Sequence, residues 1–323
     1  MHTPTPQEIA LAFDLGEPEG DLVHVRRGDN DAWRLDTATG RYFVKGYFPA
    51  TGGQFHGVGL ADQLAVATAF EARALEAGVD MPEPVDAGSG WLVSIEGRLF
   101  RVHRWVEHAG PADVSAWLGR TMAKVHALQP LGVGGLPQWW RDSVRTPETW
   151  ADWFAAGRKR GAAWAPQYQE RALLEVAERI VELCAEVPDL VTTHGDFKPH
   201  NIVSGPSGPV LVDWDSVRTD SAALEAARVA YIFGEGEPSR IESILAAYTA
   251  AGGDLSWAGP DLFLSVLRNH LQVLGEHLQV SLGETEPARW MGDRAAIEVA
   301  ISNSLRALPN RIEELSEVRR RSL

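Results

Sequence analysis

The chain has 323 residues, and 44 acidic against 30 basic side chains give it a formal net charge of −14. Hydrophobic residues are 45% and charged residues 23% of the chain, a globular composition that excludes wholesale disorder. The acidic surplus argues against a broad basic face for nucleic acid. It is compatible either with solubility alone or with steering of small cations. At roughly 150 residues per domain, the length predicts two domains or lobes.

The cysteine count and the distribution of apolar residues indicate the cellular compartment. Cys184 is the single cysteine, so the chain forms no intramolecular disulfide and no cysteine-based zinc site. No run of about 18 apolar residues exists, so no membrane span is expected. Residues 1–19 lack the basic start and apolar stretch of a secretory signal. We therefore expect a cytoplasmic protein without membrane partners.

The first hundred residues alternate short strand signals with one helix. An apolar stripe at helical spacing, ended by Gly78, predicts the helix at 59–77. Enrichment in β-formers between turn clusters predicts the strands, at residues 22–25, 32–35, 41–48, 91–95 and 99–106. This β-rich part, residues 1–106, is the expected N-terminal nucleotide-binding lobe.

Helical patterns dominate after Gly110-Pro111. Helices are expected at 114–128 and 170–186, and from residue 222 to the end, with a loop-rich, aromatic stretch at 131–166. Residues 107–323 are therefore the expected second lobe, and the whole chain is predicted to be α+β.

The segment 190–216 carries the chemistry. Two short apolar runs flank the Gly205-Pro206-Ser207-Gly208 turn and predict a hairpin that folds Asp213 back beside Asn201. Oxygen ligands of this kind suit Mg²⁺, which also takes phosphate oxygens. Asp196, on the loop just before, is a third carboxylate that can accept a proton from an attacking hydroxyl. This combination is typical of phosphoryl transfer.

The run His194-Gly195-Asp196-Phe197-Lys198-Pro199-His200-Asn201, followed by Asp213, resembles the catalytic loop and metal-binding Asp of the aminoglycoside phosphotransferase and choline kinase-like family. The resemblance covers residues 20–230. It implies a bilobal, protein-kinase-like fold with a small antiparallel N-lobe sheet plus one helix and a larger helical C-lobe. It also implies that Asp196 is the catalytic base, Asn201 a Mg²⁺ ligand and Asp213 the principal Mg²⁺ ligand.

The same resemblance predicts the donor side of the site. Lys45, on the third strand, would bind the donor phosphates and pair with Glu71 of the following helix. The hinge would lie at Arg104, Trp105 and Val106, where backbone groups would meet adenine. The implied cofactors are ATP, with GTP as an alternative donor, and Mg²⁺. Lys198 either neutralises charge on the transferred phosphoryl group or is a solvated loop residue.

The chain also departs from the protein-kinase pattern. The first hairpin lacks Gly-x-Gly-x-x-Gly and carries only Gly28-Asp29-Asn30-Asp31. Trp214-Asp215 follows Asp213, and no Ala-Pro-Glu comes after it. These differences argue against a protein kinase and favour a small-molecule acceptor.

The resemblance places the acceptor site between the catalytic loop and the C-terminal helices, here Trp139–Trp164 and Trp257–Arg294. Asp215, Asp220 and Glu276 are candidate partners for ammonium groups, with buried or solvated structural roles as the alternative. We expect a kinase for a hydroxyl of a small amine-bearing molecule, an aminoglycoside or other antibiotic first and an amino sugar or amino alcohol of metabolism second. The expected partners are a nucleotide triphosphate and this cationic substrate, bound by a monomer or homodimer.

Two readings of other classes remain. His194, Asp196 and His200 offer mixed ligands for a metal-dependent hydrolase, although no second cluster completes such a site. A catalytically inactive kinase-like binding module is the other reading, and every predicted catalytic position is nevertheless filled.

Overall fold

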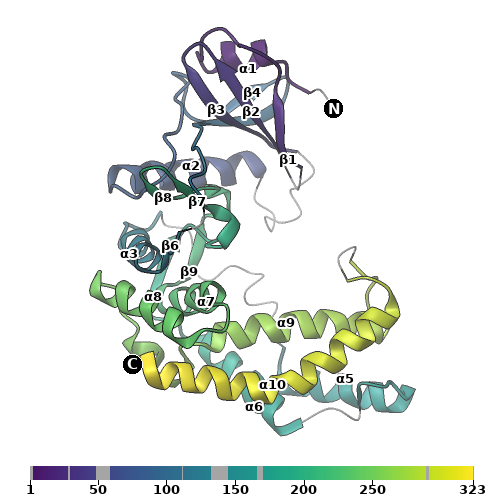
Figure 1. The fold of residues 1–323 in the computed structure, drawn as a ribbon. Coiled ribbons are helices and arrows are strands. Elements are labelled where there is room, and N and C mark those ends of the chain that lie inside the picture. The colour runs from purple at the N-terminus through teal and green to yellow at the C-terminus, as the bar shows by residue number, and fades with distance from the viewer. Residues whose placement is uncertain are drawn as a thin grey trace. The chain divides into compact units, whose positions relative to one another are not determined.

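The computed structural model describes residues 3–27, 30–48, 59–110, 112–131, 145–165, 170–288 and 291–322 (Figure 1). Two compact units make up the chain. The first combines Met1–Val114, Leu128–Val133 and Thr192–Arg218, and the second combines Ser115–Ala127, Gly134–Val191 and Thr219–Leu323. Thr192–Arg218, which carries the expected catalytic motif, thus groups with the N-terminal sheet. The lobe boundary near residue 107 stays a prediction.

The first unit is built on a five-stranded antiparallel sheet with the order β1-β2-β3-β5-β4. The strands confirm the sequence-based prediction of a β-rich start to the chain. Their bounds are Val23–Arg27 for β1, Asp31–Thr37 for β2, Gly40–Gly46 for β3, Val93–Ile95 for β4 and Arg98–Arg104 for β5.

One face of this sheet is apolar and packs against α1 (Pro6–Ala12). The sequence analysis did not predict this helix, although Thr5 and Glu8 form a capping box at its start. Ile9 and Phe13 are almost fully buried there. They join the sheet residues Trp33, Leu35, Tyr42, Val44, Phe100 and Val102 in one core. Burial of these side chains supplies the main stabilisation of the sheet.

The other face of the sheet carries charge. Lys45 of β3 lies directly opposite Arg101 of β5, and Phe43 lies opposite His103. Side chains of opposite partners share one face of a sheet, so two cations lie next to each other here. Helix α2 (Leu60–Glu76) confirms the predicted helix and brings the fully buried Glu71 to these cations.

The catalytic segment consists of short strands and single turns. Strand β6 (Leu190–Thr193) pairs with β9 (Arg218–Ser221), and β7 (Ile202–Gly205) forms the predicted hairpin with β8 (Gly208–Leu211). One 3₁₀ turn, η3 (Pro199–Asn201), precedes this hairpin, and another, η4 (Trp214–Ser216), follows it. The ring of Trp214 packs against Phe70 of α2, with centroids 6.2 Å apart. This contact joins the segment to the helix.

The second unit is mainly helical in its described residues. Its long helices are α3 (Ser115–His126), α5 (Pro147–Arg160), α6 (Glu170–Ala185), α7 (Ala222–Gly234), α8 (Pro238–Ala250), α9 (Leu264–Ser281) and α10 (Arg294–Ser322). A 3₁₀ segment, η5 (Ser256–Asp261), links α8 to α9. Helix α3 packs closely on α8 because Gly119 has no Cβ to overlap the backbone of Ile244. None of the described helices has the length and apolarity that a membrane crossing requires.

Helix α5 corrects the expectation of a loop-rich stretch at 131–166. Trp150, Trp153 and Phe154 are buried on one face at helical spacing, and Thr146 caps the helix at its start. These aromatic residues form the apolar face of a helix and are not loop residues.

Candidate active site

Gly195 and His194 fix the path of the catalytic loop. Gly195 has a φ of 80°, and a Cβ at this position would overlap the carbonyl oxygen of Ser216. The buried His194 accepts a hydrogen bond at Nδ1 from the backbone N–H of Asp196 (3.2 Å). Its Nε2 therefore carries the proton, which it donates to the carbonyl oxygen of Val212 (3.0 Å). His194 thus ties the loop to the second strand of the hairpin.

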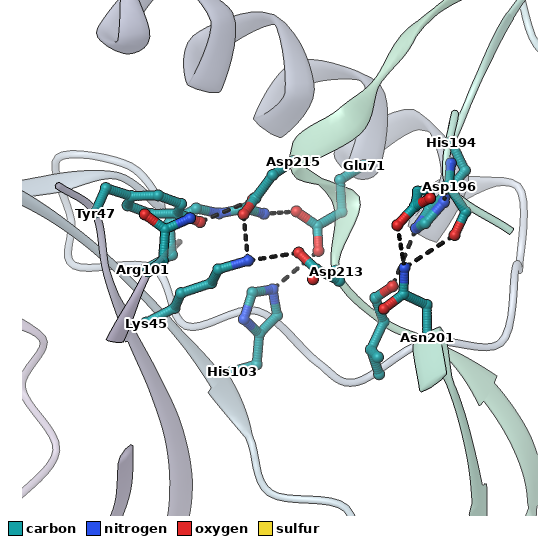
Figure 2. A network of polar contacts seen from close by, with 12 residues as sticks. Lys45, Tyr47, Glu71, Arg101, His103, His194, Asp196, Asn201, Asp213 and Asp215 are labelled. Atoms are coloured by element: carbon teal, nitrogen blue, oxygen red, sulfur yellow. Dashed lines mark hydrogen bonds and ion pairs between the residues drawn. The ribbon is translucent and has the colours of Figure 1, made fainter. Parts of the chain in front are cut away.

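Asp196 is held from two sides (Figure 2). The Asn201 Nδ2 group donates to both the backbone carbonyl and Oδ2 of Asp196, each at 2.9 Å. The ammonium of Lys198 lies 2.6 Å from Oδ1. Because its amide nitrogen is used in this way, Asn201 keeps its amide oxygen for another donor or for a cation. The structure therefore brings together Asp196, Lys198 and Asn201, and their roles in catalysis and metal binding stay predictions.

The hairpin places Asp213 next to Asn201. Ile202 pairs with Leu211, and the Val212 N–H donates to the Asn201 carbonyl at 3.0 Å. Asp213 follows directly and adopts a left-handed backbone with φ 68° and ψ 59°, a conformation that costs energy for a residue with a Cβ. Its carboxylate is 36% exposed. Strained backbone and an accessible carboxylate at one residue are typical of a functional position.

Lys45 contacts two carboxylates of this segment. Its Nζ lies 2.5 Å from Asp213 Oδ1 and 2.5 Å from Asp215 Oδ2. Burial alone would lower the pKa of Lys45, but the charges of Asp215 and Asp213 outweigh burial and raise this pKa. Lys45 is therefore a charged group beside the expected metal ligand.

Glu71 has other partners than the predicted Lys45. Its carboxylate forms an ion pair with Arg101 Nη2, and its Oε1 lies 2.9 Å from His103 Nε2. Burial, followed by the charge of Arg101, lowers the pKa of His103 to about 3, so the imidazole stays neutral and donates to Glu71. The expected Lys45–Glu71 pair is thus replaced by a pair from Lys45 to Asp215 and another from Arg101 to Glu71.

The position of Asp215 also differs from the expectation of an acceptor contact. Its Oδ1 accepts hydrogen bonds from Tyr47 Oη (2.8 Å) and Arg101 Nη1 (3.0 Å), while Oδ2 faces Lys45. Burial would raise the pKa of Asp215, but Lys45 and then Arg101 lower it, so the group is a carboxylate. Its oxygens are occupied inside the first unit, which leaves Asp215 in a charge network rather than at a surface for ammonium groups.

The other predicted acceptor residues belong to the second unit. Asp220 is fully buried and pairs with Arg228 Nη2 at 2.8 Å, which gives this carboxylate a structural role. Glu276 of α9 is half-buried and accepts a hydrogen bond from Gln272 (3.2 Å), and its substrate contact stays a prediction. Residues 139–144 and 289–290 of the expected acceptor region lie outside the described residues, as do residues 28 and 29 of the first hairpin turn.

The expected hinge follows the last residues of β5. The Arg104 guanidinium donates to the Thr39 carbonyl (3.1 Å) and Tyr42 Oη (2.8 Å), and the Trp105 N–H donates to the Arg41 carbonyl (2.9 Å). These donors are therefore engaged with β3 and its turn. Val106 lies against Gly205 of the hairpin. Adenine binding by the hinge stays a prediction.

Sequence analysis missed three residues of the network, namely Tyr47, Arg101 and His103. The run Phe100-Arg101-Val102-His103 alternates apolar and polar side chains, so the polar face of this strand could be recognised in the sequence. Two neighbouring cations on one buried face require carboxylates between them. This requirement could have predicted a buried carboxylate beside Lys45 and Arg101. It did not reveal which carboxylates would come there.

The oxygens of Asn201 and Asp213 fit a Mg²⁺ ion, because an amide and a carboxylate oxygen are hard ligands and the Asp213 carboxylate is accessible. The hydrolase alternative fits poorly. Both ring nitrogens of His194 are used in hydrogen bonds, and His200 is exposed. Among the described residues, no group of three or more His, Cys, Asp or Glu side chains is arranged to hold a metal ion.

Comparison with known proteins gives a family match and a set of similar folds. The sequence matches the phosphotransferase enzyme family over residues 25–261. An aminoglycoside phosphotransferase from Alicyclobacillus acidocaldarius is 15% identical with a TM-score of 0.68, and the match covers 100% of this chain and 97% of that one. An amicoumacin kinase in complex with AMP-PNP and Ca²⁺ is 9% identical with a TM-score of 0.64, over 94% of this chain and 92% of that one.

A choline/ethanolamine kinase family protein from Mesorhizobium loti is 16% identical with a TM-score of 0.54, over 98% of each chain. No curated protein matches the sequence. The α+β, kinase-like fold predicted from the sequence is confirmed.

Proposed function

Because the chain belongs to the phosphotransferase enzyme family, we propose that it transfers a phosphoryl group from ATP to a hydroxyl of a small, amine-bearing molecule, with Mg²⁺. The prediction of a small-molecule kinase is confirmed at the level of this family. An aminoglycoside or another antibiotic is the proposed acceptor class, which would make the protein a resistance enzyme.

The arrangement of Asp196, Asn201 and Asp213 carries this proposal. The Asn201 amide nitrogen orients the Asp196 carboxylate, and the hairpin register brings Asp213 close to Asn201. Asn201 and Asp213 would hold Mg²⁺, which when bound neutralises charge on the donor phosphates. Lys45 would contribute a further positive charge to them.

The proposed transfer is direct. The acceptor oxygen bonds to the terminal phosphorus of ATP, the bond from this phosphorus to the β,γ-bridging oxygen breaks, and ADP leaves. The acceptor hydroxyl gives its proton to the Asp196 carboxylate. Lys198, which contacts Asp196, would offset charge on the phosphoryl group.

A panel of acceptors tests the proposal. ADP release would be measured with Mg²⁺ and ATP or GTP across aminoglycosides, other hydroxylated antibiotics, amino sugars and amino alcohols. A single strong response among the antibiotics supports the proposed class, and one among the amino alcohols or amino sugars assigns a metabolic kinase instead. Failure of every nucleotide with Mg²⁺ to stabilise the protein against heat would refute phosphoryl transfer itself.

Asp196→Asn separates the proposed base from nucleotide binding. The amide keeps the size of the side chain but cannot accept the hydroxyl proton, so turnover should fall by about 10²- to 10⁴-fold. Heat stabilisation by Mg²⁺ and ATP should persist. Asp36→Asn is a matched control, because Asp36 pairs with Arg41 at the surface of the same unit. Full turnover of the Asp196 variant would remove Asp196 from the proposed role.

A further inference from the structure

We infer that Arg101 is a positioning residue for nucleotide binding, which sets the place of the Lys45 ammonium by holding Asp215. This inference rests on the proposed function, because Lys45 is the residue expected at the donor phosphates. It concerns how this chain holds that lysine, given that Glu71 does not (Figure 2).

The sheet register creates the need for such a residue. Lys45 and Arg101 face each other on neighbouring strands, with only 16% and 1% of their side chains exposed. Two like charges at such close range destabilise a sheet unless carboxylates separate them. Asp215 meets this need because it binds Lys45 through one oxygen and Arg101 through the other.

Arg101 joins two elements that lie far apart in the sequence. Its Nη1 donates to Asp215 of η4, and its Nη2 forms the ion pair with Glu71 of α2. A guanidinium can serve two carboxylates at once because its donors form a rigid fork. The packing of Phe70 on Trp214 links the same two elements. Arg101 therefore fixes Asp215 relative to both the sheet and the helix.

Lys45 would lose one of its two carboxylate partners if Asp213 bound Mg²⁺. Asp213 is its accessible partner and the expected metal ligand, whereas Asp215 is buried behind it, with 13% of its side chain exposed. If Asp213 is taken up by Mg²⁺, Asp215 is the carboxylate that still restrains Lys45. The direction of Lys45 towards the donor phosphates then depends on Arg101 and Tyr47, the two other groups bound to Asp215.

A double-mutant cycle between Arg101 and Lys45 tests the inference in the intact protein. Binding of a non-hydrolysable ATP analogue with Mg²⁺ would be titrated for the wild type, Arg101→Lys, Lys45→Met and the double variant. The lysine keeps the charge at 101 but loses the fork, so affinity should fall by about tenfold in the wild-type background. In the Lys45→Met background the same change should have little further effect.

Arg228→Lys is the matched control. Arg228 is also a buried arginine that pairs with two carboxylates, Asp220 and Glu225, but it belongs to the second unit. Loss of this guanidinium should lower the thermal midpoint and leave nucleotide affinity unchanged. Tyr47→Phe provides a second variant in case Arg101→Lys does not fold, because it removes only the hydroxyl that binds Asp215. Tyr47→Phe should also lower the affinity for the nucleotide when Lys45 is present, and should have little effect in the Lys45→Met background.

The outcomes are distinguishable. The positioning role is supported if Arg101→Lys or Tyr47→Phe weakens nucleotide binding in the wild-type background but has no further effect on binding in the Lys45→Met background. The positioning role would be overturned if Arg101→Lys or Tyr47→Phe left nucleotide affinity unchanged. It would also be overturned if their loss of affinity added in full to the loss caused by Lys45→Met. In both cases the proposed function stands. Absence of nucleotide binding by the wild type would overturn the proposed function instead.

Discussion

At the scale of single residues, the three carboxylates of the site differ in what holds them. Asp196 is bound by Asn201 and Lys198, Asp213 by Lys45 alone among its described partners, and Asp215 by three donors. The number of bound donors sets what each oxygen has left to offer. Asp213 and Asp196 keep accessible oxygens for a cation or a proton, whereas Asp215 has its acceptors occupied.

Asp213→Ala should abolish the effect of Mg²⁺ on nucleotide binding. The substitution removes the accessible carboxylate close to Asn201, and one amide oxygen is a poor magnesium site. Thermal unfolding would be followed with ATP, with and without Mg²⁺. The wild type should gain stability only when both are present, and the variant should show no gain from the metal. An Asp213→Ala protein that still responds to Mg²⁺ would contradict the assignment of Asp213.

His103 should make the protein less stable in mild acid. Its pKa is lowered to about 3 in the folded protein, from an ordinary value of 6.5, chiefly by burial. Below pH 6.5 the unfolded chain therefore binds a proton that the folded protein does not take up, and the free energy of unfolding falls. The loss is about 1.4 kcal/mol for each pH unit below 6.5 and stops near the folded pKa.

Chemical denaturation of His103→Gln checks this effect. Glutamine retains a donor for Glu71 but does not titrate, so the difference in unfolding free energy between about pH 7.5 and about pH 5 should shrink by about 2 kcal/mol relative to the wild type. The same pH dependence in both proteins would show that His103 is not the group that takes up the proton.

At the scale of elements, the site depends on turns that only certain residues permit. The catalytic loop turns at Gly195, runs through η3 and returns along the β7–β8 hairpin to the left-handed Asp213. The His194 ring links the two ends of this path through Asp196 and Val212. Positions of Asp196 and Asp213 are therefore set by backbone geometry rather than by the side chains themselves.

Gly195→Ala should destabilise the protein and disrupt the loop. An alanine there meets both the positive φ, worth about 1–2 kcal/mol, and overlap with the Ser216 carbonyl. Gly97→Ala separates the two causes, because Gly97 has a similar φ of 78° and open space around its Cβ position. Urea denaturation should show a clearly larger loss for the Gly195 variant. Equal losses would mean that the close approach to Ser216 is relaxed at no cost.

At the scale of the whole molecule, charge is the dominant feature. A net charge of −14 attracts cations and repels anions such as the expected nucleotide, and bound Mg²⁺ and cations such as Lys45 and Arg101 would oppose that repulsion locally. The two expected substrates have opposite charges, so the field of the protein should act on them in opposite directions.

Salt should therefore change the two specificity constants in opposite senses. When ionic strength rises from about 0.01 M to about 0.15 M, the Debye length falls from about 30 Å to about 8 Å. The kcat/KM for a cationic acceptor should decrease, and the kcat/KM for Mg²⁺-bound ATP should increase. Steady-state kinetics at both ionic strengths measures each ratio. Changes in the same direction for both substrates would show that the net charge does not steer them.

Local chain geometry controls one part of the site, and this part could be predicted from the sequence alone. The spacing of Asp196, Asn201 and Asp213, with a turn between two apolar runs, predicted a hairpin that the structure contains. A hairpin is set by its own turn and strand residues, so a single short segment is sufficient for the prediction.

The pairing of the buried charges depends on tertiary packing. Lys45 and Asp215 are 170 positions apart by their residue numbers, and Arg101 meets Asp215 across 114 positions. Which carboxylate reaches a buried cation depends on how strand, helix and loop pack, and no local pattern encodes that choice. The sequence therefore supplied the expected lysine and glutamate, and the fold gave each of them a different partner because the arginine opposite Lys45 occupies Glu71.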